Sequence, residues 1–231
     1  MGNTLCQING GLHSNSPPSA LSAPFDMNFI LSSEELTALL ILSTASSFTP
    51  GPNTTLSTAL AANQGLRAAM RFILAVPVGW GLLLGLCMAG LGHLVLAIPA
   101  LRWVIIISGT LYLLWMSYRL WGTRELSNAN EDRLTITFFQ GVSVQFLNIK
   151  AWMLALSIVA GWVAGKEDAL ARGLVLLPIM MGFGLVSNLT YAVMGSLLRQ
   201  WLAQGIRLLV FNRCMAAALV FTAVWMFKTS L

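Results

Sequence analysis

Residues 134–165 read LTITFFQGVSVQFLNIKAWMLALSIVAGWVAG, and Lys150 is the only charged side chain among them. The apolar arms on either side have roughly 15 residues each, or ~22 Å as a helix rising ~1.5 Å per residue. If both arms are buried in one membrane span, a lysine stem is too short to bring its ammonium to the surface. An ionisable group at that depth is costly and marks a site by default. The alternative is that Lys150 lies at an interface, where one short helix ends and a second segment begins.

The whole chain is poor in charge. It has 231 residues, of which 57% are hydrophobic and 9% are charged, whereas a soluble domain carries ~25% charged residues. A soluble core cannot account for that shortage, so the sequence predicts an integral membrane protein. The apolar runs are continuous instead of alternating, which favours helices over a β-barrel. The net charge of +5 comes from basic residues scattered between apolar runs, which is typical of membrane topology and does not indicate nucleic-acid binding.

Few side chains are suited to catalysis or metal binding. The three cysteines, Cys6, Cys87 and Cys214, have no metal-ligand spacing. There are two histidines, and the eight acidic residues all lie outside the apolar runs. An intramembrane enzyme would need a nucleophile–base pair or a metal cluster. We therefore expect no enzymatic activity, no metal and no cofactor.

The start of the chain differs from the rest. Residues 1–26 are rich in Asn, Ser, Pro and Gly, contain no Lys or Arg, and lack the basic start and apolar centre of a signal peptide. We expect a disordered tail. Met27 begins a sequence typical of a bacterial membrane protein, so the alternative is that residues 1–26 represent an over-extended gene start.

Six apolar segments follow, each close to or above the ~20 residues that cross ~30 Å of hydrocarbon. A polar loop at 122–133 divides the chain into halves, 27–121 and 134–231, with three segments each. An odd number of spans gives the halves opposite topology. The sequence therefore predicts an all-α integral membrane protein with six transmembrane helices in two inverted three-helix repeats. The segments run over about 36–60, 72–95, 101–120, 136–163, 174–198 and 208–227.

The basic residues predict the orientation. Lys and Arg concentrate in loops that face the cytoplasm. With the N-terminus outside, the outer segments hold four basic residues and Lys150 lies within the membrane. Both termini are then outside the cytoplasm and the loop at 122–133 is cytoplasmic. The inward loops hold eight basic residues: Arg67, Arg71, Arg119, Arg124, Arg133, Arg199, Arg207 and Arg213.

Two of the predicted spans are interrupted in matching places. The first contains Ser46-Ser47-Phe48-Thr49-Pro50-Gly51-Pro52-Asn53, in which two prolines remove backbone donors and free carbonyls that need partners. The fourth contains Gln145-Phe146-Leu147-Asn148-Ile149-Lys150. Discontinuous helices at matching places in two halves are typical of transporters with a midplane binding site. The alternative is a structural kink, because prolines are common in membrane helices.

These motifs resemble a known family. The run Phe48-Thr49-Pro50-Gly51-Pro52-Asn53-Thr54, followed by Gly65-Leu66-Arg67-Ala68-Ala69, is similar to amino-acid exporters of the LysE/RhtB type, the lysine exporter and homoserine/threonine resistance translocators. The resemblance covers roughly 34–227. Further matches are Gly109-Thr110-Leu111-Tyr112-Leu113-Leu114-Trp115, Phe139-Gln140-Gly141 with Asn148-Ile149-Lys150, and Asn212-Arg213.

The chain departs from the family's pattern at Ile149, where the family usually has proline. This departure predicts a fourth span that is less sharply broken than in many relatives. The branch that exports cysteine and O-acetylserine is similar in having a β-branched residue there, after a pair like Gln145-Phe146. The resemblance is therefore nearest to that branch.

The resemblance implies export of amino acids or their derivatives across the bacterial inner membrane, by secondary transport with alternating access. Lys150 can pair with a substrate carboxylate. Carbonyls freed around the two prolines, with Asn53 and Asn148, can accept hydrogen bonds from the substrate ammonium. Asn188 and Tyr191 share a face of the fifth span and are expected either to line the pathway or to pack between helices. The candidate substrate-binding residues are Pro50, Gly51, Pro52, Asn53, Gln145, Asn148, Lys150, Asn188 and Tyr191.

The absence of a carboxylate from every predicted span favours small, neutral substrates such as threonine, homoserine or cysteine. Proton coupling is what the family suggests, and Lys150 is then the strong intramembrane candidate for the carrier. Expected partners are the amino-acid substrate and the lipid bilayer, and a homodimer is left open. The alternative functions are a channel or assembly protein without coupled transport and, less favoured, an intramembrane enzyme.

Overall fold

The computed structural model describes residues 30–123 and 136–229, and all regular structure in these ranges is helical. The predicted tail at 1–26 and most of the predicted loop at 122–133 lie outside the described residues. The elements are α1 (Ser33–Phe48), α2 (Pro52–Gln64), α3 (Leu66–Leu86), the π-helical turn η2 (Cys87–Leu91), α4 (Gly92–Ala97), α5 (Pro99–Trp121), α6 (Phe138–Leu147), α7 (Ile149–Ile158), the π-helical turn η3 (Val159–Val163), α8 (Ala169–Leu202) and α9 (Arg207–Thr229).

By length and composition, four segments of the described chain could cross a membrane: Leu66–Ala97, Pro99–Trp121, Ala169–Leu202 and Arg207–Lys228. The pair of α6 and α7–η3, bent by 69° at its break, makes a fifth if it is one span. With 16 and 13 residues, α1 and α2 are each shorter than the ~20 residues that cross a bilayer. The all-helical fold is confirmed over the described residues, with four or five candidate membrane spans, whereas the count of six spans in two inverted repeats stays a prediction.

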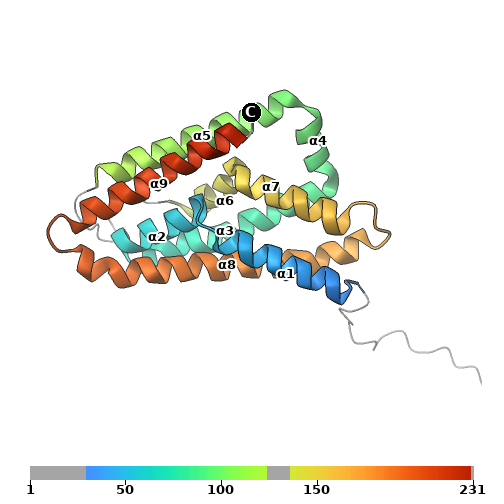
Figure 1. Ribbon diagram of the computed structural model, residues 1–231, viewed down its shortest axis with the longest axis horizontal. Helices are drawn as coiled ribbons and strands as arrows, with labels where there is room; N and C mark the ends of the chain where they lie inside the picture. Colours follow the sequence, from blue (N-terminus) through green and yellow to red (C-terminus); the bar gives the residue numbers. More distant parts are fainter. Residues whose placement is uncertain (1–29, 124–135, 230–231) are drawn as a thin grey trace, which may run out of the picture.

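The long helices run along the length of the molecule (Figure 1). Helix α8 packs against α2 and α3, and α5 packs along α9. The α2–α3 and α8–α9 turns lie at one end, on the left of Figure 1. The start of α1 and the turn between η3 and α8 lie at the other end, on the right. The chain therefore passes repeatedly between two opposite ends, as a multi-pass membrane protein does.

Helices α2 and α8 approach so closely that only glycine fits at their contact. A Cβ atom added to Gly195 would lie 2.3 Å from the carbonyl oxygen of Thr58, well inside any real contact. The obstacle is backbone and cannot rotate away. Small residues let helix backbones approach in membranes, where van der Waals packing drives association. This contact fixes α2 against α8, and α2 carries part of the site described below.

Substitution of this glycine should destabilise the fold. We expect Gly195→Ala to cost about 1–3 kcal/mol, the usual range for overpacking a close contact. Gly182→Ala is the matched control, because it lies on the same helix with nothing within 4 Å of an added Cβ. Thermal unfolding in detergent should show a lowered Tm for Gly195→Ala alone. Equal Tm values for the two variants would contradict the close α2–α8 contact.

A buried amide pair joins α2 to α9. Asn63 Nδ2 donates to Asn212 Oδ1 at 2.8 Å, and Asn212 Nδ2 donates back to Asn63 Oδ1 at 2.9 Å. Asn212 Nδ2 also donates to the carbonyl oxygen of Thr123 at 3.2 Å. Both asparagines are fully buried. Each amide donates a hydrogen bond to the other and accepts one from it. The pair therefore fixes the relative position of α2 and α9 and leaves neither buried amide without a partner.

An ion-pair cluster closes the opposite end of the molecule. Glu35, in the first turn of α1, accepts a hydrogen bond from Arg172 Nη1 at 2.9 Å. Arg172 Nε also donates to Asp168 at 2.8 Å, and Lys166 Nζ lies 3.6 Å from Glu35. The Arg172 hydrogen bond is the main cause that holds the pKa of Glu35 below its usual value of 4.5. The cluster ties the start of α1 to the start of α8.

Removing the Glu35 charge should loosen this end in a pH-dependent way. We expect Glu35→Gln to lower the stability by about 1 kcal/mol at pH 7, because solvent screens this partly exposed cluster. A depressed carboxyl pKa stabilises the fold above the unfolded-state pKa, and this contribution is lost as the pH falls through the folded-state pKa. The Tm difference between wild type and variant should therefore be constant near neutrality and shrink below about pH 4.5. A difference independent of pH would contradict an ionised Glu35.

Candidate functional site

The first helix break lies between α1 and α2, where the double-proline motif predicts it. Helix α1 ends at Phe48, and its C-cap Thr49 adopts an extended backbone with φ −71° and ψ 126°. Pro52 occupies the first turn of α2, where a missing backbone N–H costs nothing. The extended Gly51 between them donates its N–H to Thr54 Oγ1 at 2.9 Å. The motif thus ends one helix and begins the next within three residues.

The second break lies between α6 and α7 and needs no proline. Asn148 has an extended backbone with φ −91° and ψ 101°, and its Oδ1 caps α7 by accepting from the Lys150 N–H at 3.1 Å. Trp152 Nε1 donates to the carbonyl oxygen of Phe146 at 2.8 Å, which satisfies an acceptor freed by the break. The bend is 69°. The break forms without a proline because Asn148 provides both the turn and the cap of α7, and the expectation that Ile149 makes it less sharp than in many relatives stays a prediction.

The two breaks meet through Lys150. Its Nζ donates to the carbonyl oxygen of Thr49 at 2.9 Å, and a Cβ atom added to Gly51 would lie 3.3 Å from the same nitrogen. The lysine is half-buried. As the alternative interpretation expects, a second helix begins here, since α7 starts at Ile149, whereas its interface position stays a prediction. The ammonium nevertheless faces the first break, from the opposite half of the sequence.

A second contact joins the same two regions. Asn53 Nδ2, in the first turn of α2, donates to Gln145 Oε1 at 2.7 Å, and Gln145 Nε2 donates to Asn53 Oδ1 at 3.2 Å. Gln145 is fully buried near the end of α6 and also donates to the carbonyl oxygen of Gly141 at 3.2 Å. This amide pair holds the start of α2 against the end of α6. It positions the two breaks beside each other.

A cavity of about 70 Å³ lies at the junction of the breaks. It has room for several water molecules, since one requires about 10–15 Å³ by this measure. No acidic side chain of residues 30–123 or 136–229 lines it. The residues around it include Ser46, Ser47, Thr49, Gly51, Pro52, Asn53, Thr54, Trp80, Asn148, Lys150, Ser187 and Asn188.

The predicted residues separate into two groups. Gly51, Pro52, Asn53, Asn148, Lys150 and Asn188 line the cavity. Pro50 lies within the break, while Gln145 and Tyr191 support it from outside the lining. Tyr191 donates its hydroxyl to the carbonyl oxygen of Phe48 at 2.9 Å, an acceptor that the end of α1 frees. Asn188 both lines the cavity and accepts from Ser57 Oγ at 2.9 Å, so lining and interhelical bonding coexist in this residue.

The cavity is also lined by residues that the sequence did not indicate as candidates. Trp80 reaches the cavity from α3 and Ser187 from α8, and nothing in their local sequence marks them. Thr49 contributes a backbone carbonyl, which any residue at the end of α1 would supply. Thr54 and Ser46 lie beside the double-proline motif and could have been included by proximity. Within the described ranges, no group of three or more His, Cys, Asp or Glu is arranged to hold a metal ion.

The helix ends give the cavity both a region that attracts anions and a region that attracts cations. The N-cap residues of α2 and α7, Gly51 and Asn148, line it, and neither helix has an acidic residue in its first turn. N-termini attract anions through their unpaired N–H groups and the helix dipole. Helix α1 ends at the same place, which brings carbonyl oxygens such as that of Thr49 to the cavity. A solute with one carboxylate and one ammonium would find a suitable partner for each charge.

Comparison with known proteins identifies the family of the chain. The family model described as LysE type translocator matches residues 44–229, and the chain therefore belongs to that family. Proteins named cysteine/O-acetylserine efflux protein from Escherichia coli (strain K12), Shigella sonnei (strain Ss046) and Shigella flexneri are each 26% identical over 196 residues, covering 83% of this chain and 97% of the relative. No solved structure matches the chain. The resemblance inferred from the motifs is confirmed, and the chain is a multi-pass membrane translocator and not an enzyme.

Proposed function

We propose that this translocator exports small, neutral amino acids or their derivatives, of the cysteine, O-acetylserine, threonine or homoserine kind, across the bacterial inner membrane by alternating access. The observation that carries the proposal is the meeting of the two helix breaks through Lys150 and the Thr49 carbonyl, 2.9 Å apart. A substrate carboxylate can take the place of that carbonyl as the partner of the ammonium, in a charge-assisted hydrogen bond. The substrate ammonium can then bind the released Thr49 carbonyl.

The lining favours a neutral side chain. A lysine or arginine substrate would bury a second cation, which needs an acidic partner to offset its desolvation. The cavity has none and already contains the Lys150 cation. Its other polar groups, including Asn53, Ser187 and Asn188, are amides and hydroxyls that suit small polar solutes. The names of the relatives from Escherichia coli and Shigella support the same substrate class.

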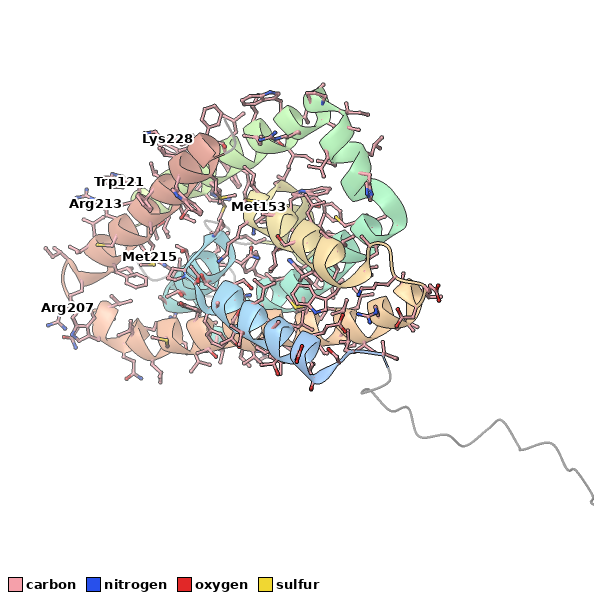
Figure 2. The ribbon with its side chains drawn as sticks, turned by 45° about the vertical axis from the view of Figure 1, so that its right-hand side comes forward. Trp121, Met153, Arg207, Arg213, Met215 and Lys228 are labelled. Atoms are coloured by element: carbon pink, nitrogen blue, oxygen red, sulfur yellow. The ribbon has the colours of Figure 1, made fainter. Side chains whose placement is uncertain are left out.

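For the topology we propose six spans in two inverted repeats, 27–121 and 134–231, with α1–α2 and α6–α7 as the broken first span of each. The basic residues support an orientation with both termini outside the cytoplasm. Arg67 and Arg199 belong to the end that holds the α2–α3 and α8–α9 turns. Arg207 and Arg213 lie near the same end of α9, and Lys228 lies near its other end (Figure 2). Labelling of a Leu231→Cys variant with a thiol reagent, applied from each side of the membrane in turn, tests this orientation.

The experiment that tests the function is efflux from cells that overproduce the protein, followed by reconstitution in liposomes. Metabolites of the medium should show enrichment of a small neutral amino acid, and purified protein should carry that compound with saturable kinetics. Imposing and then collapsing a proton gradient tests coupling to protons. Flux that stays linear with concentration would identify a channel. No enrichment of any amino acid would contradict the proposed function.

A further inference from the structure

A second cavity, of about 480 Å³, lies at the α2–α3 turn. Arg67, Arg71 and Arg199 line it, together with Gln64 and apolar residues that include Phe72 and Ile136. It shares no lining residue with the cavity at the helix breaks. Gly65, which lines it, and Asn53 are at opposite ends of α2, about 18 Å apart along the helix axis at ~1.5 Å per residue. The second cavity is therefore a separate feature at one end of the molecule.

Among the described residues, the charged side chains that line this cavity are all arginines, which are donors only. Arginine has five N–H donors and no acceptor. Arg67 and Arg71 are one helical turn apart on α3, where like charges repel, and neither is ion-paired with an acid of the described ranges. Helix α3 also begins here, at Leu66, without a side-chain cap. An acceptor-rich anion would satisfy all of these groups together.

Gln64 provides an independent indication of a ligand. The residue is 8% exposed, and its amide nitrogen is buried with no hydrogen-bond partner in the part of the chain that the structure describes. A buried donor without a hydrogen-bond partner lowers the stability of the fold, and native structures rarely contain one without a reason. Gln64 lines the same cavity as the arginines. A bound oxyanion would supply the acceptor that this donor lacks.

We propose that the cavity of Gln64, Arg67 and Arg71 is a binding site for a phosphate oxyanion, presented either by an anionic phospholipid or by a soluble phosphate compound. Arginine guanidinium groups match phosphate geometry through paired N–H donors. Basic pockets between membrane helices on the cytoplasmic side are suited to lipid headgroups. Phe72 and Ile136 offer apolar surface beside the donors, which a lipid can use and inorganic phosphate cannot.

The test uses the purified full-length protein in neutral detergent. Its Tm is measured with phosphatidylglycerol, with zwitterionic phosphatidylcholine, and with inorganic phosphate as separate titrations. Phosphatidylglycerol should raise the Tm in a saturable way and phosphatidylcholine should not. Competition by millimolar inorganic phosphate would identify soluble phosphate as a ligand of the same site, and its failure to compete would identify the lipid. Absence of a Tm shift with both phosphatidylglycerol and inorganic phosphate would overturn the proposal.

Three variants separate the site from general charge attraction. Arg67→Gln/Arg71→Gln should weaken the apparent affinity at least about tenfold, equivalent to ~1.4 kcal/mol. Arg207→Gln/Arg213→Gln removes the same charge as a matched control, because these arginines stack on Trp201 and Trp121 and do not line the cavity. Gln64→Glu keeps every arginine and places a carboxylate among them, so it should also abolish the Tm shift. A control as impaired as the double variant, or an unaffected Gln64→Glu, would contradict the site.

Discussion

Export should fall to background when Lys150 is replaced by methionine, which keeps most of the side-chain volume and removes the ammonium. The loss of one partner of a desolvated charge pair costs about 2–5 kcal/mol, so the rate at low substrate should drop more than about 30-fold. The measurement is initial efflux from liposomes at equal protein content. Lys150→Arg keeps the charge but changes its geometry, and we expect it to recover only part of the activity.

The control for this substitution is Lys228→Met. Lys228 is exposed in the last turn of α9, far along the chain from both breaks, and its loss removes the same charge. It should export at the wild-type rate. Full activity of Lys150→Met, with Lys228→Met also active, would mean that the intramembrane lysine has no part in transport.

Adding a side chain at Gly51 should block transport in proportion to its size. Gly51 is buried, with an extended backbone that any residue can adopt, so a substitution acts through space and not through backbone strain. Its Cβ would lie 3.3 Å from Lys150 Nζ and 3.4 Å from Lys150 Cδ. The flexible lysine can shift enough for alanine, and we expect Gly51→Ala to retain reduced export. Leucine would fill the cavity of about 70 Å³, and we expect Gly51→Leu to be inactive.

The control is Gly182→Leu, since an added Cβ there meets nothing within 4 Å. All three variants are compared by efflux and by Tm in detergent. We expect export to be reduced in Gly51→Ala and lost in Gly51→Leu. The Tm values of both variants should stay close to that of the wild type. A folded and fully active Gly51→Leu protein would show that the solute does not pass through this cavity.

The two breaks are predictable because each leaves a local mark in the sequence. Pro50 and Pro52 cannot continue a helix, and a lone lysine among apolar residues indicates a special position. The structure ends α1 at Phe48 and begins α7 at Ile149, as these marks indicate. The second break forms without a proline. It depends on the backbone of Asn148 and on its capping of α7, which an asparagine adopts only in the right context.

Contacts between distant segments leave no comparable mark. Nothing in the sequence states that Gln145 pairs with Asn53, or that Tyr191 satisfies the Phe48 carbonyl. Helix packing determines which side chains become partners. Close backbone approaches, such as that of Gly195 to Thr58, in turn determine the helix packing. Composition predicts a membrane protein securely because the hydrophobic and charged fractions are averaged over the whole chain. A pairing depends on the position of two side chains in space.

The most direct test of the central claim is a binding cycle with two ligands and two proteins. Saturable binding of O-acetylserine and of its carboxamide analogue is measured by calorimetry on the wild type and on Lys150→Met. If the ammonium binds the substrate carboxylate, the wild type should prefer O-acetylserine by at least about tenfold, and the variant should bind both ligands equally weakly. An undiminished preference for O-acetylserine in Lys150→Met would contradict a solute site built around this lysine.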